Sequence, residues 1–188
     1  LERERLRREL EVAAVIQSHL HPREFPDFPG YRLAARSSPS RQVAGDTYDV
    51  LVRDGLLVAT VTDVSGKGVG AGMIASGVHA GVRLLVEEEL TLETLAGRVN
   101  SYLAGATADN RFATFAMVRV ESDGTLWAVN AGHCPVLVRR ASGSVERIDS
   151  SGLPLGIMEG VPYRAVSSRL EMGDLVVRAG GRPRAAVE

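Results

Sequence analysis

The order of strand-like and helical segments predicts an α+β fold in which antiparallel sheet packs under helices. Strand-like runs with turn signals between them come first, two amphipathic helical segments follow, and strand-like runs then return. The 188 residues are 45% hydrophobic and 24% charged, which is the size and composition of one globular domain. We therefore expect one compact core.

The charge balance and the cysteine content exclude several classes of protein. Lys and Arg total 22 and Asp and Glu total 23, for a formal net charge of −1, so the basic field that drives nucleic-acid binding is missing. Cys134 is the single cysteine, which precludes an intrachain disulfide and favours a cytoplasmic protein. No apolar run approaches the roughly 20 residues that span a bilayer, so we expect no membrane contact by this domain.

Residues 1–22 are predicted to form an amphipathic connector helix. Apolar or small residues recur at coiled-coil spacing opposite a face of Glu and Arg: Leu6, Leu10, Ala13 and Leu20. This helix either lies on its own domain or forms a homodimer with a second copy, and too few heptads are present to decide. Because the chain opens with Leu1 inside a charged helix, we expect a longer protein with a sensor domain upstream.

A proline-rich stretch ends this helix, and residues 23–188 form the second predicted unit. Proline lacks an amide hydrogen and disfavours helix in the residue before it. Residues 31–37 are then predicted as a strand, while residues 48–53 and 56–62 flank Asp54-Gly55, a strong hairpin signal. The domain is therefore expected to begin with antiparallel strands.

Two helices and then further strands are predicted for the rest of the chain. Apolar residues recur at helical spacing over residues 68–90 and again over residues 92–103. Strand-like runs follow, some of them paired across Asp-Gly or Ser-Gly turns: residues 112–120 with 126–130, residues 136–140 with 145–148, residues 163–170 and residues 175–177. Strands on both sides of a helical pair are typical of a layered α+β fold.

The segment Thr62-Asp-Val-Ser-Gly-Lys-Gly68 is the densest cluster of unusual residues. Asp63 closes an apolar strand, and a glycine-rich turn into a helix suits a charged ligand, because backbone can approach the ligand closely and amide hydrogens can bind an anion. The alternative is an acidic turn that caps the helix through Asp63 or Ser65. The spacing of a nucleotide phosphate loop is absent, which argues against an ATPase.

A second acidic segment, residues 43–49, precedes the other strand of the same hairpin. Pairing across the Asp54-Gly55 turn would bring Asp46 towards Asp63, since antiparallel neighbours lie about 5 Å apart. Two carboxylates so close repel each other unless a cation lies between them, and Mg²⁺ and Mn²⁺ prefer such oxygen ligands. The alternative is that Asp46 and Asp49 are ordinary turn acids.

Several short motifs occur in order along residues 16–174: Ile16-Gln17 with Leu20-His-Pro22, Val43-Ala-Gly-Asp-Thr-Tyr-Asp49, Asp63-Val-Ser-Gly-Lys-Gly68, Phe112-Ala-Thr-Phe115, Asn130-Ala-Gly-His-Cys-Pro135, Gly152-Leu-Pro-Leu-Gly156 and Gly173-Asp174. Together they resemble the SpoIIE-type branch of the metal-dependent type 2C (PPM) serine/threonine protein phosphatases. Their number and order make the resemblance much more specific than any single motif.

The resemblance implies a four-layer α-β-β-α sandwich of antiparallel sheets flanked by helices, with a two-metal Mn²⁺ or Mg²⁺ centre at one end of the sheets. By the same similarity Asp46 ligates one metal, Asp63 bridges both, and the Val64 carbonyl is a further ligand. Asp46 and Asp63 are the implied catalytic residues, through metal-activated water that attacks phosphorus. The implied substrate is a phosphorylated anti-anti-sigma-type regulator protein of partner-switching signalling.

The other chemically notable residues are interpreted as structural or solvated. His133 has the chemistry of an acid or a ligand, but a structural turn is favoured, with its ring hydrogen-bonded to backbone. Lys67 is expected to be solvated. Cys134 has no supporting constellation for a cysteine phosphatase, because Arg139 and Arg140 follow an apolar strand and not a phosphate loop. The remaining histidines lack metal-ligand spacing: His19, His21 and His79.

The sequence departs from the family pattern towards its C-terminus. After Gly173-Asp174 the family runs through a strand into a motif whose aspartate binds metal, whereas residues 175–182 contain no acid, and the chain ends at Glu188 before another metal aspartate. Either a segment near residues 176–178 is missing, or the protein binds metal weakly and is a catalytically inactive binding scaffold. Ala44, where the family has glycine, is a minor change.

Overall fold

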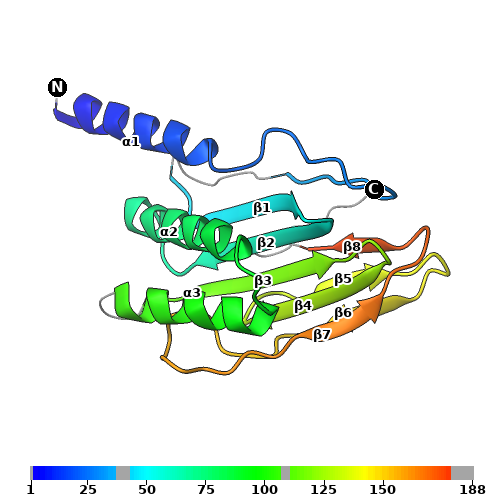
Figure 1. Cartoon of the computed structure of the whole chain (residues 1–188). Helices are drawn as coiled ribbons and strands as arrows, with labels where there is room; N and C mark the ends of the chain where they lie inside the picture. Colours follow the sequence, from blue (N-terminus) through cyan, green and yellow to red (C-terminus); the bar gives the residue numbers. More distant parts are fainter. Residues whose placement is uncertain (1, 37–42, 107–110, 179–188) are drawn as a thin grey trace.

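The computed structural model describes residues 2–36, 43–106 and 111–178, and it has the predicted α+β architecture (Figure 1). The described residues form these helices and strands: α1 (Glu2–Ser18), β1 (Asp46–Arg53), β2 (Leu56–Val64), α2 (Val69–Val86), α3 (Leu92–Ala106), β3 (Ala113–Val120), β4 (Thr125–Ala131), β5 (Val136–Arg139), β6 (Val145–Ile148), β7 (Val166–Arg169) and β8 (Leu175–Val177). The strands form two antiparallel sheets, in the orders β1-β2-β3-β4-β7 and β6-β5-β8. The predicted fold class is confirmed.

The β1–β2 hairpin forms at the turn that the sequence predicts. Asp54 and Gly55 both have positive φ, 50° and 76°, as a two-residue hairpin turn of the primed type requires. This turn sets the register of the two strands, so that Arg53 pairs with Leu56 and, at the other end, Asp46 pairs with Asp63. A local turn therefore decides which side chain of β1 lies opposite Asp63.

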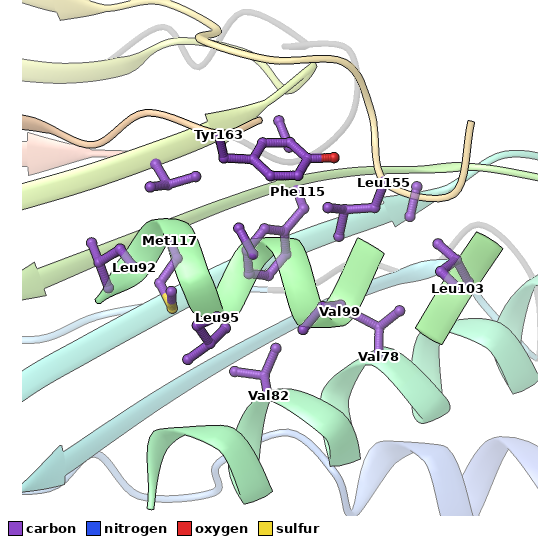
Figure 2. Packing of buried hydrophobic residues seen from close by; sticks show 14 of the residues in the cluster. Val78, Val82, Leu92, Leu95, Val99, Leu103, Phe115, Met117, Leu155 and Tyr163 are labelled. Atoms are coloured by element: carbon purple, nitrogen blue, oxygen red, sulfur yellow. The ribbon is translucent and has the colours of Figure 1, made fainter. Parts of the chain in front are cut away.

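Helices α2 and α3 cover one face of the five-stranded sheet, and the three-stranded sheet packs on its other face. Figure 2 shows the helical side of the core, where Val82 and Val99 lie close to Phe115 and Met117 of β3. Alternate residues of a strand point to opposite faces, so other β3 residues enter a second cluster between the sheets, with members Val118, Val120, Leu126, Val136, Val138 and Ile148. Burial on both faces explains the nearly continuous apolar run of β3.

The helical layer covers only the five-stranded sheet in the described part of the chain. The resemblance implied helices outside both sheets, whereas α2 and α3 both belong to the core cluster on the β3 face that bears Phe115. The strands of the three-stranded sheet are short. In β6 and β8 alternate residues are exposed. The structure therefore shows three of the four implied layers.

Helix α2 is long and apolar enough to cross a membrane, with 18 residues and a mean hydropathy of 1.5. This run of 18 residues is shorter than the roughly 20 residues used above as the length that spans a bilayer. One face of the helix is buried in the protein core, through Ala71, Ala75, Val78 and Val82. The apolar composition of α2 is therefore explained by its packing against the sheet.

Two strand predictions differ from the structure. Residues 31–36 form no strand, and residue 37 lies outside the described residues. Tyr31 and Leu33 are partly buried against the cluster between the sheets, so their alternation with polar neighbours reflects packing without a hydrogen-bonded ladder. Strand β7 starts at Val166 and not at Tyr163, whose side chain is buried in the core on the helical side.

Helix α1 is anchored to the domain through its last turn. Gln17 is its buried residue, and its side-chain amide donates to the Ala44 carbonyl at 2.7 Å and accepts from the Ala44 amide at 2.9 Å. Four large apolar residues of the helix are more than half exposed: Leu6, Val12, Val15 and Ile16. The predicted helix is confirmed, and its own domain leaves these apolar side chains exposed.

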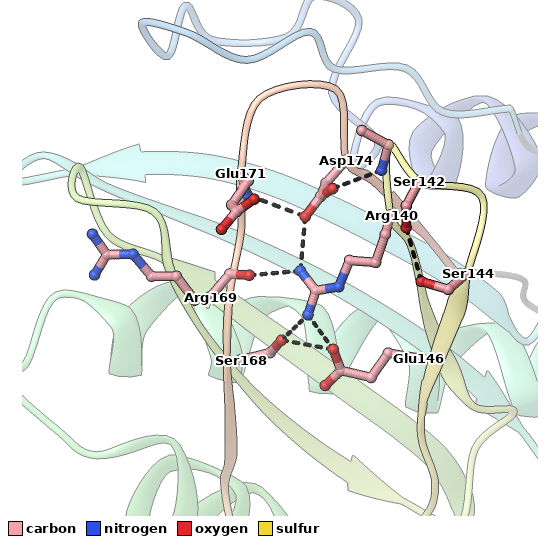
Figure 3. Close-up of polar contacts among 9 residues, drawn as sticks. Arg140, Ser142, Ser144, Glu146, Ser168, Arg169, Glu171 and Asp174 are labelled. Carbon is pink, nitrogen blue, oxygen red and sulfur yellow. Dashed lines mark hydrogen bonds and ion pairs between the residues drawn. The ribbon is translucent and has the colours of Figure 1, made fainter.

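A network centred on Arg140 ties the two sheets together at the end where β4 begins and β5 ends (Figure 3). The Arg140 guanidinium donates to the Arg169 carbonyl at 2.6 Å, to Asp174 Oδ2 at 2.7 Å and to Glu146. Asp174 also accepts from the backbone amides of Ala141 and Glu171. Because Arg169 is in the five-stranded sheet and the others belong to the smaller sheet or its turns, one side chain bridges both layers.

Candidate metal centre

Asp46 and Asp63 lie directly opposite each other at the end of the β1–β2 hairpin that is remote from its turn. Asp46 is the first residue of β1, and Asp63 is the last but one of β2. Asp46 is exposed, whereas Asp63 is partly buried because β3 flanks it on the other side, with Thr114 as its partner. The structure therefore brings together the two predicted carboxylates.

Burial, together with the neighbouring Asp46, raises the pKa of Asp63 to about 6. Desolvation by burial contributes most, followed by the charge of Asp46 and a hydrogen bond between the two carboxyl groups. No Lys or Arg in the described residues forms an ion pair with either group: the ion pairs found there involve other carboxylates. The pair thus carries negative charge that lacks a protein cation among the described residues.

Glycine and alanine beside the two aspartates fit the close approach of the strands. The Val64 amide donates to the Gly45 carbonyl at 3.2 Å, and a Cβ on Gly45 would lie 3.0 Å from the Val64 carbonyl oxygen and 3.2 Å from the Ala71 side chain. Gly45 therefore has no room for a side chain. Ala44 does not have positive φ, so its methyl group is compatible with the backbone there.

Thr114 and His133 support the strand end that carries Asp63. The Thr114 hydroxyl lies 2.8 Å from His133 Nδ1 and donates to the Asp63 carbonyl at 3.4 Å. The His133 amide donates to Asn130 Oδ1 at 2.8 Å. The His133 ring thus contacts the Thr114 hydroxyl, whereas the sequence led us to expect a structural turn with the ring bonded to backbone. Only the pairing of β2 with β3 reveals Thr114, which carried no sequence signal as a neighbour of Asp63.

Asp49 belongs to a different cluster from Asp46. Its buried carboxylate accepts from Arg83 Nε at 2.6 Å and Nη2 at 2.9 Å, and His79 Nε2 lies 3.6 Å away. The hydrogen bond from Arg83 to Asp49 raises the pKa of Arg83, and burial lowers the pKa of His79. His21 stacks on Tyr48 beside this cluster, with ring centroids 4.7 Å apart. Asp49 is therefore paired with an arginine and is not a metal ligand.

The described residues contain no group of three or more His, Cys, Asp or Glu side chains placed to hold a metal ion. Strand β8 runs back along β5, with Val177 opposite Leu137. The next residue is Arg178, whose guanidinium nitrogens are buried and find no hydrogen-bond partner among the described residues. Burial lowers the pKa of Arg178 to about 10. Residues 179–188, which include the second half of the acid-free segment 175–182, lie outside the described residues.

The residues at this end fit one divalent cation and part of a second site. Two carboxylates and a backbone carbonyl are hard oxygen ligands of the kind that Mg²⁺ and Mn²⁺ prefer, and the raised pKa of Asp63 reflects negative charge that a cation would neutralise. Two ligating carboxylates are fewer than a complete two-metal cage uses. The described part of the chain therefore supplies two of the four carboxylates that the resemblance implies, together with the Val64 carbonyl.

Residues 53–179 match the family model described as Stage II sporulation protein E (SpoIIE). The chain belongs to the SpoIIE family. The matched range includes Asp63 and Val64. It starts at Arg53, the last residue of β1, and Asp46 is the first residue of that strand. The resemblance read from the sequence motifs is confirmed.

Two curated relatives cover nearly all of this chain. "Protein IcfG" of Synechocystis sp. (strain ATCC 27184 / PCC 6803 / Kazusa) is 28% identical over 201 residues, which cover 91% of this chain and 32% of the relative. Phosphoserine phosphatase RsbU of Bacillus subtilis is 24% identical over 174 residues, which cover 92% of this chain and 52% of RsbU. The chain thus spans from a third to half of the length of these relatives.

Solved structures show the same fold. The RsbU and RsbW domains of a Mycobacterium tuberculosis protein match with a TM-score of 0.64 and 27% identity, over 74% of this chain and 39% of that one. The SiaA-PP2C domain of Pseudomonas aeruginosa matches with a TM-score of 0.74 and 16% identity, over 93% and 71%. RsbX in complex with magnesium matches with a TM-score of 0.60 and 18% identity, over 72% and 65%. The fold is that of the type 2C phosphatases.

Proposed function

We propose that this chain is a divalent-metal-dependent phosphatase domain that removes phosphate from a serine or threonine of a regulator protein. The observation that carries the proposal is the direct pairing of Asp46 with Asp63 at a strand end, with no protein cation between them in the described residues. Membership of the SpoIIE family and the likeness to a phosphoserine phosphatase support it.

The residues of the chain would hold and orient the reacting groups. Asp46 and Asp63, with the Val64 carbonyl, would hold Mn²⁺ or Mg²⁺, which supplies an activated water and neutralises phosphoryl charge when bound. Pairing of β2 with both β1 and β3 limits the movement of Asp63. The hydrogen bond between Thr114 and His133 restrains the neighbouring strand at the same level. The aspartates are therefore presented by a rigid strand end.

The proposed partners follow from the family and from α1. We propose a phosphorylated anti-anti-sigma-type regulator as substrate, in the cytoplasm, and the pairing of RsbU with RsbW domains in one solved relative supports such a partner-switching role. The exposed apolar side chains of α1, among them Val12 and Ile16, support a homodimer through this helix. A sensor domain upstream of α1 would complete the protein.

Phosphate release tests the proposed activity. A phosphoserine-bearing regulator protein would be incubated with the chain in Mn²⁺, in Mg²⁺ and in a chelator, with Asp63→Asn as the inactive control and Asp123→Asn, on the β3–β4 turn, as the matched surface control. We expect release that requires metal, disappears in Asp63→Asn and persists in Asp123→Asn. Release that persists in the chelator, or in Asp63→Asn, would contradict the proposal.

A second candidate function is a binding scaffold without turnover. It is favoured by one observation, that the described residues supply no third carboxylate for the metal. A scaffold would bind the regulator protein but release no phosphate at any metal concentration. Measuring binding of the phosphorylated and unphosphorylated regulator alongside turnover separates the two functions.

A further inference from the structure

Arg111 is held beside the loop that follows Asp63. It lies two residues before β3, and its neighbour Phe112 is bonded twice to Ser65: the Ser65 amide donates to the Phe112 carbonyl at 2.8 Å, and the Phe112 amide donates to Ser65 Oγ at 2.9 Å. Ser65 is two residues after Asp63. The backbone of Arg111 is therefore fastened to the same loop that leaves the carboxylate pair.

The guanidinium of Arg111 lies against two glycines of this loop and the helix after it. A Cβ on Gly66 would lie 3.3 Å from Arg111 Nη1, and a Cβ on Gly70 would lie 3.3 Å from Nη1, 3.4 Å from Nη2 and 3.5 Å from Cζ. The plane of the guanidinium thus covers Gly70 in the first turn of α2. These contacts place a cationic group over the exposed side of the loop.

Gly70 has no backbone reason to be glycine. Gly66 has a φ of 99°, a conformation that favours glycine, whereas Gly70 is helical and does not have positive φ. Glycine is a weaker helix former than alanine. The space that the missing side chain leaves is taken by the Arg111 guanidinium, so the sequence gives up helix stability at the position where that group rests.

We propose that Arg111 binds an anionic group of the phosphorylated substrate at the rim of the carboxylate pair, and so helps to determine substrate specificity. This inference rests on the proposed phosphatase function. A phosphorylated residue approaching Asp46 and Asp63 meets negative charge, and a guanidinium beside that path offsets the repulsion. Its planar set of donors suits phosphate and carboxylate oxygens in bidentate geometry.

Arg111 is better placed for this role than Lys67 of the same loop. Lys67 is exposed, so its side chain would lose much of its conformational freedom on binding an anion. The Arg111 guanidinium, in contrast, is seated on Gly66 and Gly70, so less conformational entropy is lost when it binds an anion. The anion is either the phosphoryl group or a carboxylate of a residue that flanks it, and the experiment distinguishes the two.

The test compares Arg111→Met and Arg111→Lys with Arg98→Met, which removes an exposed arginine of α3 that pairs with Glu88. Turnover would be measured on a phosphoserine regulator protein and on p-nitrophenyl phosphate in Mn²⁺. We expect Arg111→Met to lower kcat/KM for the protein about tenfold or more, mainly through KM, with partial recovery in Arg111→Lys and no change in Arg98→Met. A similar loss with p-nitrophenyl phosphate assigns the anion as the phosphoryl group, and loss with the protein alone assigns a flanking carboxylate.

A binding measurement keeps this inference separate from the proposed activity. In the Asp63→Asn background, where no turnover is expected, the phosphorylated regulator would be titrated into the chain with and without Arg111→Met. Weaker binding with the Met variant supports the inference even if the wild-type chain releases no phosphate. Binding and KM that change less than twofold in Arg111→Met, with thermal stability retained, would overturn it, whatever the outcome for activity.

Substitutions at two glycines of α2 test whether contact with Gly70 positions the Arg111 guanidinium. Gly70→Ala places a methyl group 3.3 Å from Arg111 Nη1, whereas Gly81→Ala, in the same helix, meets no atom within 4 Å. Both substitutions favour the helix. We expect KM for the phosphoprotein to rise in Gly70→Ala and to stay unchanged in Gly81→Ala, and an equal response of the two variants would contradict a positioned guanidinium.

Discussion

At one end of the sheets Arg140 satisfies Asp174 and Glu146, whereas at the other end Asp46 and Asp63 face each other with no protein cation in the described residues. The hydrogen bond from Arg140, with backbone amides of Glu171 and Ala141, lowers the pKa of Asp174. Burial and the neighbouring Asp46 raise the pKa of Asp63. The pKa of an aspartate is thus raised at one end of the sheets and lowered at the other.

The difference separates a structural use of carboxylates from a functional one. Asp174 is paired and hydrogen-bonded, so its charge helps to join two sheets. The pair at the other end has a raised pKa at Asp63 from burial and the neighbouring Asp46, and the proposed divalent cation would offset the charge repulsion there. Perturbed carboxylates of this kind mark functional sites more often than paired ones do, and each prediction below tests one side of the contrast.

The largest expected effect is the loss of turnover in Asp63→Asn. We expect phosphate release to fall at least about 10³-fold, because the amide is a poor ligand for a hard divalent cation. The matched variant at the opposite end, Asp174→Asn, should keep most of its turnover and lose stability. Kinetic assays and thermal unfolding of both variants check these expectations. Equal losses of turnover in the two variants would contradict the assignment of Asp63 to function and Asp174 to stability.

Arg140→Met should have the next largest effect, on stability alone. It leaves the buried Asp174 carboxylate and Glu146 without their cation, which is costly because the carboxylates then lie partly desolvated. We expect the melting temperature to fall by roughly 5 °C, with Mn²⁺ affinity unchanged. Differential scanning calorimetry measures the first quantity, and Arg147→Met, which removes a more exposed arginine paired with Asp149, is the control and should have a smaller effect.

The stability of the metal-free chain should depend on pH through Asp63. The pKa of its carboxyl rises from 3.8 to about 6 on folding, so the folded chain holds more protons than the unfolded chain between these values. Stability therefore falls as the pH rises from about 4 to about 6. Thermal unfolding in a chelator should show this decline in the wild-type chain and a weaker one in Asp63→Asn. An equal decline in both would assign it to other groups.

The smallest expected effect is that of Gln17→Ala. Gln17 bonds both backbone groups of Ala44, which is two residues before Asp46, so its loss should loosen the start of β1. We expect Mn²⁺ affinity to fall only a few-fold, as for residues that orient a ligand without touching the metal. Ser18→Ala, whose hydroxyl bonds the Val15 carbonyl within the same helix, should leave the affinity unchanged in the same titration.

The sequence predicted the parts of the fold that local patterns specify. The Asp54-Gly55 turn predicted the β1–β2 hairpin and its register, and this register places Asp46 opposite Asp63. The helical periods of α2 and α3 were equally clear. The segment from Tyr31 to Arg36 was mistaken for a strand, because alternation reports which side chains are buried and not whether the backbone finds a hydrogen-bonding partner.

The parts that the sequence did not predict depend on contacts between distant segments. Asp46 and Asp49 lie in the same acidic segment, and the sequence alone does not distinguish their roles. Only the packing of α2 on β1 reveals that Arg83 pairs with Asp49. The Arg140 network likewise unites residues from two turns and a strand. The seat of Arg111 on Gly70 joins the start of β3 to α2. No local sequence pattern predicts such contacts, because each charged partner taken alone is expected to be solvated.

The central claim, that a divalent cation binds between Asp46 and Asp63, is tested most directly by calorimetric titration of Mn²⁺ into the metal-free chain, with Asp63→Asn and Arg140→Met titrated in the same buffer. We predict binding by the wild-type chain and by Arg140→Met, release of protons on binding near pH 6 because the cation displaces the proton of the pair, and loss of that binding in Asp63→Asn. Binding of equal strength in Asp63→Asn, or none in the wild-type chain, would contradict the claim.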